Sequence, residues 1–283
     1  YPELDVRMRK LELKRQGGGE APTALVTLAR LGMKTSFIGK IGDDEPGSFI
    51  LSGLAEEGVD TSHMVVEKGV SSIIAFCIIE KGSGKRTIVW YKELKPLEQY
   101  DFDPEFLCSG KILHLDHHEP ESATIAASLF KSTGRPIVLD IDSYDYRMEQ
   151  LLSLVDVAIG SENFARCFNP NHYEEAVQKI HHMGPKIVVL TLGEKGCLCY
   201  DGVESFIEPG FSVDVVDTTG CGDVFHGAFI YGLLQKWDLR TTARFSNAMA
   251  ALKCTKLGGR TGIPNRQQVE TFLSHGVMRK NSE

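Results

Sequence analysis

The chain has 283 residues, of which 42% are apolar and 24% are charged, a balance that disfavours an intrinsically disordered chain. Its 31 basic and 38 acidic residues give a net charge of −7, which disfavours a general nucleic-acid binder because such a protein needs a basic surface. No apolar run approaches the roughly 20 residues that span a bilayer, so a membrane protein is not expected.

Short apolar runs alternate with helical patterns along the chain, which predicts an α/β fold whose parallel-rich sheet is flanked by helices. The predicted strands are Ser36–Gly39, Ile112–Leu115, Pro136–Ile141, Asp156–Ile159 and Ile187–Leu192. The predicted helices are Ala21–Leu31, Pro46–Glu57, Glu121–Lys131, Tyr146–Leu154, Tyr173–Met183, Asp223–Gln235, Leu239–Lys256 and Arg266–Ser274.

The first glycine-rich segment, Gln16–Thr23, runs into the predicted helix Ala21–Leu31, and Gly32 predicts the end of that helix. The segment does not match the G-x-G-x-x-G fingerprint of dinucleotide-binding proteins. A glycine-rich turn that opens a helix is either a structural turn or a loop that approaches a ligand. The segment alone leaves both interpretations open.

A β-hairpin is predicted from two β-rich runs, Ser71–Glu80 and Arg86–Tyr91, which are joined through Gly82-Ser83-Gly84. It is either an edge decoration or a mobile lid over the carboxyl ends of the parallel strands. Apolar residues occupy both faces of its first strand, which predicts contact with a second copy of the chain in a homodimer. A P-loop is disfavoured here because Ile79 stands where its first glycine is required.

Three histidines lie near the end of the predicted strand Ile112–Leu115: His114, His117 and His118, together with Asp116. Ligands bind at the carboxyl ends of parallel strands, so a substrate contact is one interpretation. A dedicated metal site is disfavoured because no further Cys or His stands at a usable spacing.

The most specific motif is Asp217–Asp223, which reads Asp-Thr-Thr-Gly-Cys-Gly-Asp and leads into the predicted helix Asp223–Gln235. Glycines at a helix start bring free N–H groups close to a ligand, and the helix dipole attracts an anion. Asp223 could be no more than a favourable cap. Two glycines within three residues of it instead place a general base beside an anion site, which suits phosphoryl transfer to a hydroxyl.

The two glycine-rich segments together resemble the signatures of the PfkB (ribokinase-like) family of carbohydrate kinases. The first is matched by Gly18-Gly19 through Ala29-Arg30-Leu31-Gly32, and the second by Asp217–Asp223 with Cys221 in place of Ala. Tyr1-Pro2 with Asp5, and the run Lys85–Tyr91, are most similar to the ketohexokinase branch. The resemblance implies a ribokinase-like fold over residues 1–283, with a β-lid insertion around residues 71–91 and a first core strand ahead of Tyr1.

The resemblance also implies a kinase that uses ATP and Mg²⁺ to phosphorylate a small-molecule sugar, with Asp223 as the general base. The anion hole for the transferred group would be formed by Gly220, Cys221 and Gly222. The sugar would be bound by Asp5, Gly18, Gly19, Glu20, Thr23 and Arg86. The nucleotide would be bordered by Thr191, Gly193, Gly196 and Asn247.

Three positions depart from the family pattern. Phe164 stands where the family has an acid that helps to organise Mg²⁺, so Glu162 is left as the candidate metal-binding residue. Thr23 replaces the usual Asn and keeps only a hydroxyl. Glu20 replaces an Asn of the ketohexokinase branch, and its carboxylate favours a neutral, hydroxyl-rich sugar and repels a sugar phosphate.

Two alternatives remain. One is a nucleoside or sugar-phosphate kinase of the same family, and the other is a non-catalytic relative that binds sugar or nucleotide. Retention of Asp223 argues against the second, whereas Phe164 argues for it.

The cysteines are odd in number, irregularly spaced and without a C-x-x-C pair, which disfavours a disulfide framework. This pattern predicts that the protein is located in the reducing cytoplasm. They are Cys77, Cys108, Cys167, Cys197, Cys199, Cys221 and Cys254. The first residue is Tyr1 rather than Met, so further N-terminal residues are expected ahead of it.

Overall fold

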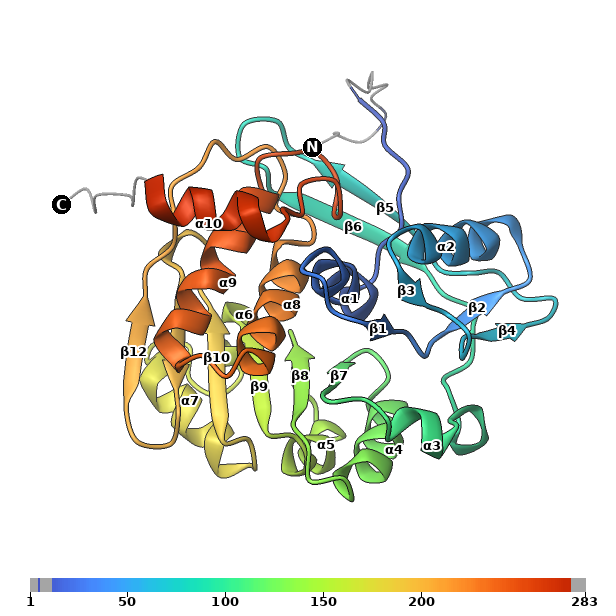
Figure 1. Cartoon of the computed structure of the whole chain (residues 1–283), viewed down its shortest axis with the longest axis horizontal. Helices are drawn as coiled ribbons and strands as arrows, with labels where there is room; N and C mark the ends of the chain where they lie inside the picture. Colours follow the sequence, from blue (N-terminus) through green and yellow to red (C-terminus); the bar gives the residue numbers. More distant parts are fainter. Residues whose placement is uncertain (1–4, 6–11, 276–283) are drawn as a thin grey trace.

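The central sheet has six strands in the order β12-β11-β10-β9-β8-β7 (Figure 1). The computed structural model describes residue 5 and residues 12–275. The strands of this sheet are β7 (Leu113–Asp116), β8 (Ile137–Ile141), β9 (Val157–Ser161), β10 (Ile187–Thr191), β11 (Cys197–Tyr200) and β12 (Ser205–Glu208). Strands β7 to β10 run parallel, whereas β11 and β12 pair antiparallel. The predicted parallel-rich α/β fold is therefore confirmed.

The middle strands of the sheet are buried on both faces. Every residue of β8 is buried, which is the pattern of a parallel strand covered by helices on each side. Successive side chains alternate between two apolar cores, so Val138 and Val189 join one core and Leu139 and Leu190 join the other.

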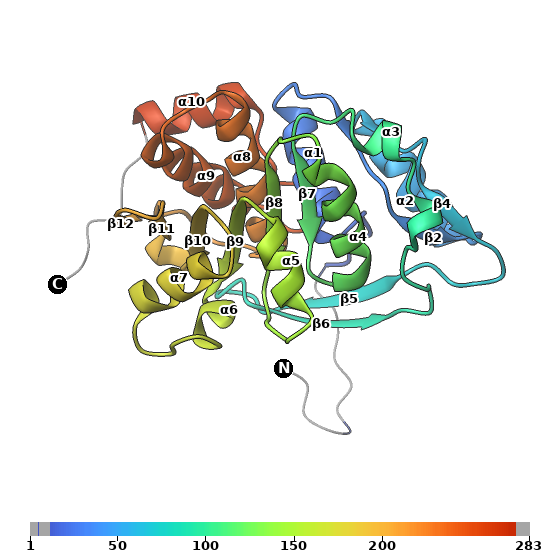
Figure 2. The same ribbon diagram turned by 90° about the horizontal axis from the view of Figure 1, so that it is seen from below.

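Two sets of helices supply the rest of these cores, and Figure 2 shows α5 and α7 across the strands from α8 and α9. The first set is α1 (Glu20–Arg30), α8 (Cys221–Leu234), α9 (Leu239–Lys253) and α10 (Arg266–His275). The second set is α3 (Pro104–Leu107), α4 (Pro120–Lys131), α5 (Met148–Leu154), α6 (Glu162–Arg166) and α7 (Tyr173–His182). The helices α1 and α8 therefore begin on the same side of the sheet.

Three small sheets lie beside α1 and α2 (Glu45–Glu56). They are formed by β1 (Thr35–Ser36) with β3 (Val59–Asp60), β2 (Lys40–Gly42) with β4 (Val65–Glu67), and β5 (Ile74–Ile79) with β6 (Arg86–Tyr91). The last pair is antiparallel and confirms the predicted hairpin. None of the described helices combines the length and apolarity that a membrane crossing needs.

One predicted strand is wrong. The run Ser36–Gly39 does not form a single strand, because β1 ends at Ser36 and β2 starts at Lys40 in a different sheet. The chain bends between them, where the Phe37 ring lies so close to Gly39 that a side chain at that position would collide with it. The prediction also missed β12 and the two- and three-residue strands, which are too short to show an apolar period.

Candidate active site

A large open cleft of about 2700 Å³ lies between the β5–β6 hairpin, the amino ends of α1 and α8, and the carboxyl end of β7. The predicted residues that line it are Gly18, Gly19, Glu20, Thr23, Arg86, Gly220 and Asp223. Outside its lining, among the described residues, are Asp5, Glu162, Thr191, Gly193, Gly196, Cys221, Gly222 and Asn247. The structure thus brings together most of the predicted sugar-site residues and the predicted base.

Asp217 holds the loop that precedes α8 in place. Its side chain is fully buried, where Oδ1 accepts a hydrogen bond from the Thr219 amide at 2.8 Å and Oδ2 accepts one from the Gly258 amide at 2.7 Å. Its carbonyl oxygen accepts a further bond from Lys253 Nζ at 2.9 Å. Asp217 therefore stabilises this loop structurally, and it borders the cleft together with Asp223.

Gly220 is the residue from which α8 starts, and its backbone is left-handed with φ of 78°. A Cβ atom at this position would lie 2.6 Å from the Gly259 carbonyl oxygen, closer than real Cβ contacts. Only glycine meets both conditions at no cost. Gly220 itself lines the cleft, so the start of α8, where free N–H groups and the helix dipole favour an anion, lies at the edge of the cleft.

Asp223 lies on the first turn of α8 and lines the cleft. Burial raises the pKa of its carboxyl well above the ordinary value, the charges of Glu20 and Cys221 raise it further, and Arg86 opposes them. A carboxylate with a raised pKa is a stronger proton acceptor than an exposed one. The cleft thus holds a candidate general base one turn from the candidate anion site.

The turn of the β5–β6 hairpin is hydrogen-bonded to the loop that precedes Gly220. Thr218 donates twice to the Gly84 carbonyl oxygen, from its amide at 3.1 Å and from its hydroxyl at 2.9 Å. Arg86 Nη1 also donates to Thr218 Oγ1 at 3.2 Å. Arg86 therefore lies beside the loop that leads into the candidate anion site.

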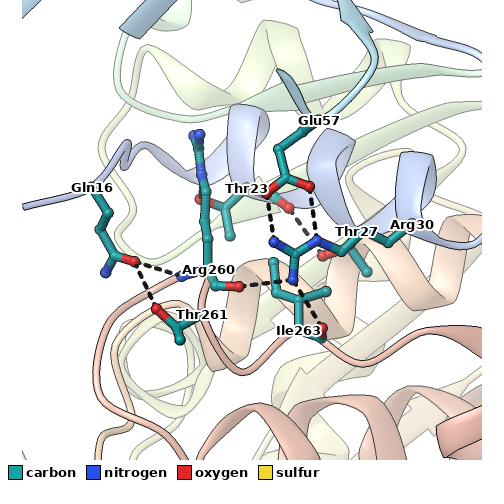
Figure 3. Close-up of polar contacts among 8 residues, drawn as sticks. All are labelled: Gln16, Thr23, Thr27, Arg30, Glu57, Arg260, Thr261 and Ile263. Carbon is teal, nitrogen blue, oxygen red and sulfur yellow. Dashed lines mark hydrogen bonds and ion pairs between the residues drawn. The ribbon is translucent and has the colours of Figure 1, made fainter. Parts of the chain in front are cut away.

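Arg260 lies beneath the first glycine-rich segment, and Figure 3 shows it beside Thr23 and Gln16. Its guanidinium donates from Nε to Thr23 Oγ1 at 3.2 Å and from Nη2 to the Gly18 carbonyl oxygen at 2.7 Å. Burial lowers its pKa to about 10, although the Asp223 carboxylate raises it. The side chain of Thr23 is thus occupied by Arg260, and Arg260 becomes a candidate site residue that the sequence did not reveal.

Arg30 fixes the segment that carries Arg260. Its Nη1 donates to the carbonyl oxygens of Arg260 and Ile263 at 3.0 and 2.9 Å (Figure 3). Its Nε and Nη2 form a bidentate pair with Glu57 at 2.8 and 2.5 Å. Such a bidentate pair is rigid, so Arg30 at the end of α1 holds the segment behind the cleft in place.

Glu20, the first residue of α1, faces two histidines from the end of β7. Its Oε1 lies 3.1 Å from His118 Nε2 and its Oε2 lies 3.7 Å from His117 Nδ1. The hydrogen bond that His118 donates to Glu20 raises the pKa of His118 to about 9 despite partial burial. The predicted sugar-site carboxylate therefore has a cationic neighbour, and these three residues could hold a metal ion.

A second polar cluster lies deeper, where His114, Asp140 and His226 come within 4.8 Å of one another through one atom each. His226 Nδ1 lies 3.3 Å from Asp140 Oδ2. Burial lowers the pKa of His114 to about 4, and burial raises the pKa of Asp140 together with the charges of Glu20 and Asp223. The fold thus places residues from distant parts of the chain within metal-ligating distance of these histidines, which sequence spacing does not reveal.

The residues predicted to border the nucleotide lie near the ends of β10 and β11. Thr191 closes β10 and donates through Oγ1 to the Gly160 carbonyl oxygen at 3.3 Å. Gly193 and Gly196 have φ of 59° and 97° in the turn after β10. The Asn247 amide donates to the Glu208 carbonyl oxygen at 3.0 Å, which buries it against this turn.

Glu162 is the residue directly after β9. Because Ser161 at the end of β9 pairs with Thr191 at the end of β10, Glu162 lies at the same edge of the sheet as the residues predicted to border the nucleotide. Its Oε1 accepts hydrogen bonds from Tyr173 Oη at 2.5 Å and from Arg166 Nη2 at 3.1 Å. Phe164 is fully buried in the core, so this position of the helix does not present a group to a metal. Asp5 is exposed, with a backbone φ of 62°.

Three site residues escaped the sequence analysis: Asp140, His226 and Arg260. Asp140 was visible as the one acid inside the apolar run Pro136–Ile141, and His226 as the residue one helical turn after Asp223. Arg260 gave no local signal, because its partner Thr23 is 237 residues away.

The family model described as pfkB family carbohydrate kinase matches residues 2–266. Ribokinase of Haemophilus influenzae is 30% identical over 267 residues, which cover 91% of this chain and 87% of that protein. A 5-dehydro-2-deoxygluconokinase of Geobacillus thermodenitrificans is 29% identical over 287 residues, with 91% and 84% covered. The solved ribokinase of Thermotoga maritima is 26% identical with a TM-score of 0.82, and the match covers 96% of this chain and 93% of that one.

Proposed function

Because the chain belongs to the PfkB family of carbohydrate kinases, we propose that it transfers the γ-phosphoryl group of ATP to a hydroxyl of a neutral monosaccharide. The observation that carries the proposal is Asp223, a carboxylate of raised pKa on the first turn of α8, beside the left-handed turn at Gly220. The likeness to ketohexokinase stays a prediction.

In the proposed reaction, the sugar lies in the cleft between Glu20, the Gly18-Gly19 turn and Asp223. Asp223 takes the proton of the attacking hydroxyl, and the amides of Gly220, Cys221 and Gly222 neutralise the transferred group. The nucleotide lies over Thr191, Gly193, Gly196 and Asn247. The hairpin excludes water, and Arg86 approaches the phosphates from it.

Mg²⁺ is part of the proposal, since it neutralises the charge of the phosphates in phosphoryl transfer. A Mg²⁺ ion that is bound mainly by phosphates and water needs only one or two protein carboxylates. Glu162 can supply one, because both of its hydrogen bonds go to Oε1. Arabidopsis thaliana ribokinase was solved with ribose and ATP, and an E. coli protein of this fold with ATP and Mg²⁺.

The direct test is an ADP-release assay over ketoses, aldoses, nucleosides and sugar phosphates, with and without Mg²⁺. Phosphorylation of a monosaccharide supports the proposal. ATP binding without ADP release for every acceptor would instead favour the non-catalytic relative, to which Phe164 in place of an acid points.

Neutral monosaccharides are expected to have a higher kcat/KM than sugar phosphates. The negative charge of Glu20 raises the pKa of Asp140 and of the proposed base Asp223, so its electrostatic effect extends across the cleft. The same charge would repel the phosphate of a sugar phosphate. A substrate phosphate normally needs a dedicated Arg or Lys, whereas Arg86 and Arg260 already donate to Thr218 and to the Gly18 loop.

The matched variant for this specificity is Glu20→Gln, which keeps the shape and removes the charge. It is expected to raise the kcat/KM for sugar phosphates relative to neutral sugars. A wild-type preference for any sugar phosphate over every neutral sugar contradicts the prediction.

We also propose a homodimer through the lid. The hairpin exposes large apolar side chains on both faces. Ile74, Phe76, Ile78, Val89 and Tyr91 share one face, whereas Ile88 and Trp90, which line the cleft, lie on the other. Phe76 alone is 71% exposed. Two strands are marginal in water without a partner, and contiguous apolar patches of this kind mark interfaces.

Phe76→Asp is expected to convert the dimer to a monomer, because the carboxylate would be buried in the apolar contact. Light scattering at micromolar concentration measures the change, and the affinity for sugar should fall more than that for ATP. Tyr146→Asp is the control, since Tyr146 is 80% exposed but lies outside the hairpin. A wild-type mass near 31.3 kDa, the mass of one chain, would contradict the proposed dimer.

All seven cysteines are free thiols in the structure. This supports the proposal that the protein works in a reducing compartment such as the cytoplasm.

A further inference from the structure

Three polar side chains from β7, β8 and α8 converge below the cleft. His114 on β7 is the register partner of Val138 on β8, so His114, Val138 and, two residues later, Asp140 point to the same face of the sheet. Val138 belongs to the apolar core that α8 helps to form, so this is the face that α8 covers. His226 comes from that helix, and one atom each of His114, Asp140 and His226 lie within 4.8 Å of one another.

Two buried nitrogen atoms at this convergence have no hydrogen-bond partner among the described residues. They are His114 Nε2 and His226 Nδ1. His226 is 3% exposed and Asp140 is 5% exposed. His226 Nδ1 lies 3.3 Å from Asp140 Oδ2, yet the two atoms are not aligned as a hydrogen bond. Polar atoms and a carboxylate are costly to bury in this way unless a further group satisfies them.

The other ring nitrogen of His114 shows which atom is free to bind that group. His114 Nδ1 lies 3.3 Å from the Val138 carbonyl oxygen, which can only accept a hydrogen bond. Nδ1 therefore carries the proton, and Nε2 presents a lone pair to the convergence. A histidine that binds a metal ion usually donates from its second nitrogen in this manner, and the bond fixes the orientation of the ring.

We propose that His114, Asp140 and His226 bind a divalent transition-metal ion, with Zn²⁺ as the best match. Two imidazole nitrogens and one carboxylate oxygen suit Zn²⁺, with water in the fourth position, whereas Mg²⁺ and Ca²⁺ prefer oxygen ligands. In a tetrahedral site with bonds of about 2.0–2.1 Å, neighbouring ligand atoms lie about 3.3 Å apart. This is the separation of His226 Nδ1 and Asp140 Oδ2.

The ion would link the first part of α8 to the sheet. Its ligands come from β7, β8 and α8, and His226 follows Asp223 by one helical turn. Binding of this kind stabilises the folded state, because the unfolded chain does not hold the three ligands together. His114 lines the cleft, which gives the ion a route to the site. The site does not rest on the proposed function, and its ion is distinct from the Mg²⁺ of phosphoryl transfer.

Glu20, His117 and His118 form the other cluster within metal-ligating distance. Glu20 Oε2 and His117 Nδ1 also lack a hydrogen bond there. Glu20, however, already has a counter-charge, because its Oε1 lies 3.1 Å from His118 Nε2, and the His118 side chain is 53% exposed. This cluster is therefore balanced without a metal ion and provides the internal comparison.

The test removes metal ions from the full chain with dipicolinic acid and then titrates it with Zn²⁺ against a chromophoric chelator. The expected result is one tightly bound Zn²⁺ per chain and a melting temperature that rises with Zn²⁺ concentration. Co²⁺ in place of Zn²⁺ should give the intense visible bands of a four-coordinate site, without the charge-transfer band of a thiolate ligand.

Asp140→Asn keeps the shape of the side chain and removes the charged ligand. Loss of a group that only orients a ligand costs about 10–100-fold in metal affinity, so loss of the ligand itself should cost at least about 10²-fold. His226→Gln should weaken binding similarly and serves as the second variant if Asp140→Asn does not fold. His118→Gln is the matched control and should keep the wild-type affinity for Zn²⁺.

Three outcomes would overturn the proposal. The first is binding no tighter in the wild type than in Asp140→Asn or His226→Gln. The second is a thiolate band in the Co²⁺ spectrum, which would place the ion on cysteine. The third is loss of binding in His118→Gln alone, which would place it at Glu20. None of these measurements contains sugar or ATP, so a failure of the proposed function leaves the metal site still tested.

Discussion

Asp223→Asn is expected to lower kcat by about 10²–10⁴-fold, the usual effect of losing a positioned base. Asparagine keeps the shape of the side chain but cannot accept the proton of the sugar hydroxyl. Binding should survive, because the amides of α8 and the Glu20 region are untouched. Calorimetric titration with ATP and with the sugar, beside steady-state kinetics, separates the two effects.

The pH profile gives an independent reading of the same residue. The pKa of Asp223 is raised, so the proton-accepting form increases as pH rises through that raised value. The acidic limb of kcat/KM is therefore expected above the ordinary range of an aspartate, and to be absent in the Asn variant.

A measurement of thermal stability shows whether Asp223→Asn loses activity because the base is missing or because the protein no longer folds. A carboxyl whose folded pKa is raised favours folding below that pKa, and this contribution disappears as the pH rises through it. Removing the charge should thus leave the melting temperature at neutral pH unchanged or higher. Asp214→Asn, at an exposed acid of the same chain region, is the control. Near wild-type turnover in Asp223→Asn would show that another group is the base.

Gly220→Ala is expected to lower kcat/KM by about 10²–10³-fold, the effect of losing anion-hole donors. The left-handed backbone costs about 1–2 kcal/mol for a residue with a Cβ, and that atom would lie 2.6 Å from the Gly259 carbonyl oxygen. The turn must therefore move, and the amides of α8 move with it.

Gly222→Ala is the matched comparison, because a Cβ there meets nothing within 4 Å. It should retain at least about ten times the kcat/KM of Gly220→Ala, since its amide stays in place. Thermal unfolding should show the same order. If both variants are equally impaired, the geometry of the turn at Gly220 is not what the reaction requires.

Local patterns predicted those parts of the molecule that local forces determine. A short run in which four of five residues are apolar, as in Ile137–Ile141, indicates a strand covered on both faces when glycine and helical segments flank it. The motif Asp217–Asp223 predicted the start of α8 from residues within one turn of each other, and it supplied Asp223 as the candidate base. The bend at Phe37–Gly39 escaped because it depends on a ring folding over a glycine, which no period reveals.

The polar contacts around the cleft could not be predicted from the sequence, for a different reason. Glu20, His117 and His118 meet because α1 starts where β7 ends, and this follows from the packing of the two elements. Arg260 reaches Thr23 from a loop near the other end of the described chain. Sequence spacing carries no information on such contacts. The sequence therefore predicted Thr23 as part of a candidate sugar site but did not predict that Arg260 would bind its side chain.

The hydrogen bonds between the hairpin and the loop before α8 have a thermodynamic consequence. Gly84 and Arg86 share Thr218 as partner, and Thr218 stands two residues before Gly220, the turn proposed to receive the phosphoryl group. A ligand that orders the hairpin also orders this turn, and the entropy of ordering is lost only once. The coupling is reciprocal, so the factor by which an acceptor tightens the binding of ATP equals the factor by which ATP tightens the binding of that acceptor.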